Sequence, residues 1–132
     1  MGPFCFRPNT EDSMGLDDQL GGVHPDLALV IKALFTSVCH LVPGTQLIYH
    51  PRSRQHVSSP NVVAFRIVPR KGLVRMRVYG HPYKFENQPD LPLKPYRYSY
   101  SECALSSPAQ LSAAARYIKQ AADFKRRGRR RL

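Results

Sequence analysis

The stretch from Val62 to Gly80, "VVAFRIVPRKGLVRMRVYG", alternates apolar and polar side chains on both sides of a Pro-Arg-Lys-Gly turn. Alternation with a period of two predicts two antiparallel strands, whose successive side chains point to opposite faces. The apolar face is expected to be buried, and it comprises Val63, Phe65, Ile67, Val74, Met76 and Val78. The cations are expected outside, with Arg66, Arg75 and Arg77 on the opposite face and Arg70 and Lys71 at the turn. The segment therefore predicts a sheet that is covered on one face only.

Helical periodicity is found in the sequence both before and after this hairpin. The first helix is predicted from Pro25, which suits a first helical position, to the stop at Pro43-Gly44. The second begins in "SSPAQ", where Ser107 and Gln110 form a capping box, and it runs into the basic C-terminus.

Further strands are predicted at 45–50 and at 96–105, where Tyr96, Tyr98 and Tyr100 alternate with polar residues. The polar segment 51–61 and the proline-rich segment 80–95 are predicted to be loops. The predicted fold class is α+β, with an antiparallel sheet of about four strands and an N-terminal and a C-terminal helix packed on one face.

The positive charge of the chain is unevenly distributed. The 132 residues suffice for one domain, predicted at 24–124, between a flexible leader at 1–23 and a disordered basic tail at 125–132. Residues 1–24 hold one cation and four anions, net −3, whereas 25–124 are net +8 and 125–132 are net +6. Because the body is basic even without the tail, a polyanionic partner is expected.

The cysteines and the hydropathy pattern bear on the compartment. Cys5, Cys39 and Cys103 are odd in number, widely spaced and without a C-x-x-C, so we expect a reducing compartment and neither a disulfide framework nor a zinc site. No stretch is apolar enough to span a membrane, and no signal-peptide pattern is present. The sequence therefore predicts a cytoplasmic protein without membrane contact.

Catalytic motifs are weak in this sequence. A restriction-type nuclease needs Glu-x-Lys on a strand, but Ala104 follows Glu102 where the lysine belongs, so Glu102 is predicted to pair with a neighbouring arginine. His50 and His56 flank an arginine-rich loop, and solvated loop histidines are the favoured interpretation over a ribonuclease-like His/Arg/Tyr set. No glycine-rich phosphate loop follows a strand. No catalytic residue, metal or cofactor is predicted.

The residues predicted to bind nucleic acid combine the hairpin cations, one tyrosine and the tail: Arg66, Arg70, Lys71, Arg75, Arg77, Tyr79, Lys125, Arg126, Arg127, Arg129, Arg130 and Arg131. The arginines would contact phosphates, while Tyr79, Tyr83 or Tyr98 would stack on bases. The competing interpretation is that the strand arginines only keep the sheet soluble.

The predicted function is that of a small basic nucleic-acid-binding or ribonucleoprotein accessory module without catalysis. The first alternative is a protein-interaction subunit that docks a larger nuclease or complex through its exposed sheet face. The second, less favoured, is a small toxin-type ribonuclease.

Two stretches, "VVAFRIVPRKGLVRMRVYG" and "SYSECALSSPAQLSAAARYIKQAADF", resemble a small bacterial domain family of unknown function that is described as a predicted transport protein domain. The resemblance covers about residues 25–124. Members of that family occur alone or beside restriction-nuclease-like modules, so the resemblance implies work on nucleic acid. It implies no catalytic residues.

Overall fold

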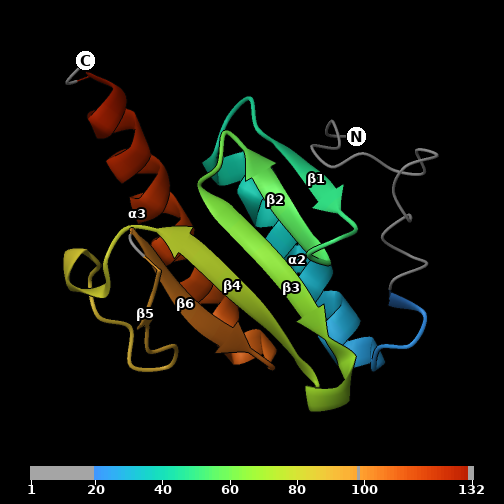
Figure 1. Ribbon diagram of the computed structural model, residues 1–132. Coiled ribbons are helices and arrows are strands. Elements are labelled where there is room, and N and C mark those ends of the chain that lie inside the picture. The colour runs from blue at the N-terminus through green and yellow to red at the C-terminus, as the bar shows by residue number, and fades with distance from the viewer. Residues whose placement is uncertain (1–19, 98, 131–132) are drawn as a thin grey trace.

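The computed structural model describes residues 20–97 and 99–130, with side chains described up to Gly128, and it has two layers. One layer is a six-stranded sheet in the order β1-β2-β3-β4-β6-β5, and the other consists of two helices that lie against one of its faces (Figure 1). The helices are α2 (Pro25–Leu41) and α3 (Leu111–Arg130). The strands are β1 (Gln46–His50), β2 (Gln55–Ser59), β3 (Val63–Val68), β4 (Leu73–Tyr79), β5 (Lys94–Tyr96) and β6 (Tyr100–Leu105). All neighbouring strands are antiparallel. The face without helices is called the open face below.

The predicted α+β class, antiparallel sheet and terminal helices are confirmed, but the sheet has six strands instead of about four. Strand β2 was expected to be loop because its inward residues are polar. Ser58 Oγ accepts hydrogen bonds from the N–H groups of Val62 (2.9 Å) and Val63 (3.1 Å) and donates to the Pro60 carbonyl (2.7 Å). These bonds offset the cost of burying a hydroxyl. Strand β5 has only three residues and contains Pro95, which is tolerated because β5 lies at the edge of the sheet.

The prediction of one strand over 96–105 was wrong. The chain turns between β5 and β6, where Arg97 has a φ of 48°, and Tyr96 pairs with Tyr100 across this turn. The residues of β6 that are buried are Ser101, Cys103 and Leu105, whereas Tyr96 and Tyr100 are only partly buried. Ser101 remains compatible with the core because its Oγ donates a 2.6 Å hydrogen bond to the Gly80 carbonyl.

The hairpin has the predicted turn and the predicted faces. The turn Pro69–Lys71 ends at Gly72, whose φ of 64° lies in the left-handed region that glycine adopts without strain. Five of the six expected core residues are fully buried, and Ile67 is partly buried against them. Arg66 lies opposite Arg75, and Ala64 lies opposite Arg77, on the open face.

The long connection between β4 and β5 is anchored to α3 at two places. The Tyr117 hydroxyl donates to the Leu91 carbonyl (2.6 Å) and accepts from the Gln88 N–H (3.2 Å). Gly80 has a φ of 129°, and a Cβ at this position would lie 3.0 Å from the rings of Phe85 and Phe124. The segment 80–93 is therefore held close to the helix, although it has little regular structure.

The ends of the domain differ from the expected boundaries. Leu20, inside the expected leader, is buried in the core, while residues 1–19 lie outside the described part of the chain. Residues 125–130 continue α3 instead of starting a disordered tail. Lysine and arginine are good helix formers, and Arg126 pairs with Asp123 one turn before it. Arg131 and Tyr98 also lie outside the described residues.

Cys39 is disulfide-bonded, whereas the sequence predicted no disulfide framework. Cys103 is free and buried, and Cys5 lies outside the described residues. The cysteines therefore no longer support a reducing compartment. Among residues 20–97 and 99–130, neither helix has the length and apolar character that crossing a membrane requires.

Candidate nucleic-acid interface

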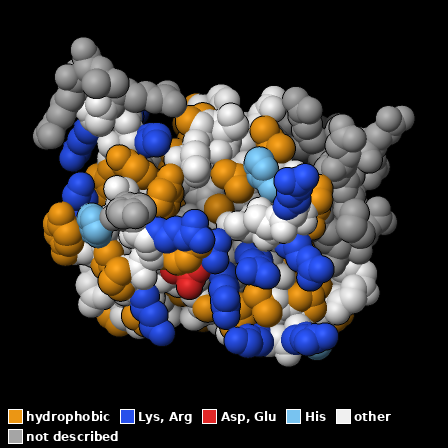
Figure 2. Space-filling model, viewed as in Figure 1, with side chains coloured by type: hydrophobic (Ala, Val, Ile, Leu, Met, Phe, Trp, Pro, Cys, Tyr) orange, Lys and Arg blue, Asp and Glu red, His pale blue; other side chains and the backbone are white. Residues whose placement is uncertain are grey.

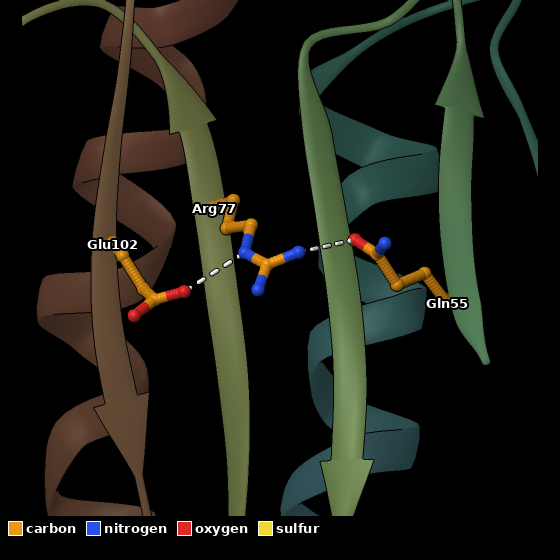
Figure 3. A network of polar contacts seen from close by, with 3 residues as sticks. All are labelled: Gln55, Arg77 and Glu102. Carbon is orange, nitrogen blue, oxygen red and sulfur yellow. Dashed lines mark hydrogen bonds and ion pairs between the residues drawn. The ribbon is translucent and has the colours of Figure 1, made fainter. Parts of the chain in front are cut away.

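Arg77 lies at the centre of a polar network on the open face (Figure 3). Its Nε donates to Glu102 Oε2 on β6, and its Nη1 donates to Gln55 Oε1 on β2, each at 2.8 Å. The guanidinium carbon also lies 4.0 Å from the centre of the Tyr96 ring. Ala64 is the residue directly opposite Arg77, so only a methyl group stands on β3 where the guanidinium crosses towards β2.

The network gives Arg77 a structural role. Its side chain is only 13% exposed and that of Glu102 is 26% exposed, so the ion pair is largely shielded from water. The predicted pairing of Glu102 with a neighbouring arginine is confirmed. Arg77 was expected to be free for phosphate, but two of its nitrogens are already engaged within the sheet.

We expect Glu102→Gln to lower the free energy of unfolding by about 1–3 kcal/mol, because a largely buried guanidinium loses its counter-charge. Urea denaturation monitored by circular dichroism measures this change. Glu86→Gln is the matched control, since it removes the same charge from an exposed side chain. Equal stability of the two variants would contradict a structural role for the pair.

A second group of cations surrounds a hollow of about 450 Å³ beside the β3–β4 turn. This basic hollow is lined by five cations and three apolar residues: Arg54, Arg66, Arg70, Lys71, Arg75, Ile67, Val68 and Pro69. Figure 2 shows the open face, where Lys and Arg side chains gather over the turn end of the hairpin and acidic side chains occupy one small area. The expected site residues Arg66, Arg70, Lys71 and Arg75 are thus brought together.

Arg54 is the member of the basic hollow that sequence reasoning missed. It lies in the turn between β1 and β2, in the left-handed region with a φ of 55°. Only its position in an arginine-containing loop was visible in the sequence. The pairing of β2 with β3 brings that turn to the hairpin.

The five cations of the basic hollow carry like charges and repel one another. Arg66 and Arg75 lie directly opposite on adjacent strands, an arrangement that destabilises an antiparallel pair. None of the five cations forms an ion pair within residues 20–97 and 99–130. An anion bound between them would relieve this repulsion.

A second hollow, of about 420 Å³, lies at the other end of β4. This aromatic hollow is lined by Tyr79, Lys84, Phe124, Arg127 and Gly128. The Lys125 ammonium lies 4.5 Å from the centre of the Tyr79 ring, an attractive cation–π distance. Part of the predicted tail is therefore placed against the predicted tyrosine, at the end of β4 away from the basic hollow. Arg129 and Arg130 belong to the last turn of α3.

The two histidines on which the alternative ribonuclease interpretation depends differ in solvent exposure. His50 is exposed, whereas His56 is 5% exposed and lies between the rings of Phe35 (4.9 Å) and Tyr49 (4.8 Å). Burial, and to a smaller extent the nearby His50, lowers the pKa of His56 to about 4. His56 was expected in a solvated loop, but it is a core residue that no substrate reaches. In the described part of the chain, no three His, Cys, Asp or Glu side chains group as a metal site requires.

Comparison of the chain with protein-family models, with curated proteins and with solved structures finds no match. The resemblance noted from the sequence therefore stays a prediction.

Proposed function

We propose that this protein is a small nucleic-acid-binding module, acting alone or as an accessory of a ribonucleoprotein, and that the open face of its sheet contacts the phosphates. The observation that carries the proposal is the basic hollow, in which five cations converge without an acidic partner in the described residues. Phosphate contacts supply most of the affinity in such complexes, so converging cations are the feature that binding needs.

The exposed side chains favour nucleic acid over the alternative of a protein-docking face. In the part of the chain described here, only Leu29 and Tyr83 are large hydrophobic residues with exposed side chains, and Leu29 belongs to α2. A docking face for a stable complex usually has a more apolar centre than this sheet offers. The proposal assigns no catalytic step, and a cytoplasmic location remains a prediction.

Salt dependence of binding tests the proposal. We expect the protein to bind a labelled oligonucleotide with an affinity that falls steeply with salt, because each neutralised phosphate contributes about −0.7 to −0.9 to the slope of log affinity against log salt. Substituting Arg66→Gln and Arg75→Gln together should make the slope shallower by about 1.5 units. Fluorescence anisotropy across a salt series measures both quantities.

The matched control removes the same charge from the other layer. Arg116→Gln with Lys119→Gln deletes two exposed cations from α3, away from the open face. This double variant should retain the wild-type slope. If the two double variants lose equal affinity, only net charge matters and the open face is not the binding surface.

A further inference from the structure

A pair of stacked aromatic rings, one of them exposed, lies just beyond the end of β4. The His81 and Tyr83 rings are stacked, with centroids 5.5 Å apart and planes 17° from parallel. Tyr83 is 79% exposed, which leaves most of its ring surface in contact with water. A flat, exposed π-surface of this kind is what nucleobases cover when proteins bind unpaired strands.

The segment that carries the pair is well anchored. Pro82–Lys84 form a short 3-10 turn, and the next residue, Phe85, is buried with its ring 5.1 Å from that of Phe124 and 5.5 Å from that of Tyr117. Proline fixes one backbone angle of the turn. The exposed ring is thus attached to a fixed support, and a ligand that covers it loses little affinity to ordering the loop.

The charges around this pair suit a nucleotide. Lys84, which follows Tyr83 in the chain, lines the aromatic hollow together with Arg127. Arg75 in the basic hollow and Tyr79 in the aromatic hollow are four residues apart on β4, about 13 Å at the usual rise per residue. Arg75 lies on the open face, and Tyr79 lies at the end of the same strand, where its hollow extends to α3. One strand of nucleic acid that follows β4 can therefore reach both hollows.

We propose that the ligand is a single-stranded nucleic acid, with phosphates at the basic hollow and an unpaired base stacked on Tyr83. This inference rests on the proposed function and adds the class of nucleic acid. In a duplex the bases are stacked on one another and present only their edges in the grooves, so they cannot cover an exposed ring. A single strand presents the free base faces that this site accommodates.

The test compares three ligands of equal length: a single-stranded oligonucleotide, the same backbone with abasic positions, and the duplex. Loss of one stacked base costs about 1–3 kcal/mol, so Tyr83→Ala should weaken single-strand binding about 5- to 150-fold. Its affinity for the duplex and for the abasic strand should stay within about twofold of wild type, because phosphate contacts are unchanged. Fluorescence anisotropy at constant salt gives all three affinities.

Two matched variants complete the experiment. Tyr83→Phe keeps the ring and should keep single-strand affinity. Leu29→Ala removes an exposed hydrophobic side chain from α2 and should change none of the three affinities. Equal affinity of wild type and Tyr83→Ala for the single strand overturns the inference, as does equal weakening for all three ligands. In either case binding through the basic hollow still stands. A wild-type protein that binds none of the three ligands overturns the proposed function as well.

Discussion

Phe65→Ala should lower the free energy of unfolding by about 3–5 kcal/mol, because it leaves a ring-sized cavity in the core. Phe65 is fully buried on β3, with its ring 5.2 Å from that of Phe35 on α2. It pairs with Met76 on β4 and with His56 on β2, so the cavity would open where the helix and three strands meet. The backbone of a central strand cannot move far enough to fill such a space.

Urea denaturation measures this loss, and two further variants calibrate it. Phe65→Leu keeps most of the volume and should cost about 1–1.5 kcal/mol, so the effect is measurable even if the alanine variant does not fold. Leu29→Ala changes a side chain that is 66% exposed and should stay within about 0.5 kcal/mol of wild type. A loss below about 1 kcal/mol for Phe65→Ala would show that this face of the hairpin is not the core.

Acidification should destabilise the protein through His56. In the unfolded chain this histidine takes up a proton below its ordinary pKa of 6.5, but burial lowers the pKa of the folded state to about 4. Between these values the unfolded state binds more protons, so the free energy of unfolding falls as the pH falls. The slope is about 1.4 kcal/mol per pH unit, and the loss reaches about 3 kcal/mol near pH 4.

Denaturation at a series of pH values between 4 and 7 measures this slope. His56→Phe keeps a ring between Phe35 and Tyr49 but cannot titrate, so the part of the slope due to this residue should disappear. If wild type and His56→Phe have the same slope, His56 is not neutral in the folded core.

The hairpin was predictable from sequence because its turn, its alternation and its apolar content all point to one structure. Strand β2 was not, because His56 and Ser58 are polar residues that face inward. The free-energy cost of burying them is offset by the packing of the His56 ring and by the hydrogen bonds of Ser58, and these contacts exist only after the chain has folded. Local pattern therefore indicated a loop where the structure has a strand next to the centre of the sheet.

The candidate site was predictable to the extent that it is local in sequence. Four of its cations belong to one hairpin, for which the sequence predicted Arg66 and Arg75 on the outer face and Arg70 and Lys71 at the turn. The partners of Arg77 come from three separate segments, at Gln55, Tyr96 and Glu102. The sequence predicted an arginine partner for Glu102, but no spacing along the chain identified it as Arg77 or indicated the contacts with Gln55 and Tyr96. For this reason Arg77 was predicted to bind nucleic acid, although the fold uses it to join neighbouring strands.

Gly80 has a consequence for recognising distant relatives of this chain. Its backbone angle suits glycine, and the rings of Phe85 and Phe124 occupy the space that a side chain would need. Surface cations can be exchanged during evolution without loss of this fold, whereas a substitution at this position would displace the rings that hold the loop to α3. An alignment of true relatives should therefore show glycine directly after the fourth strand, an aromatic residue five positions later, and a second aromatic residue in the last helix, even where the charge pattern has diverged.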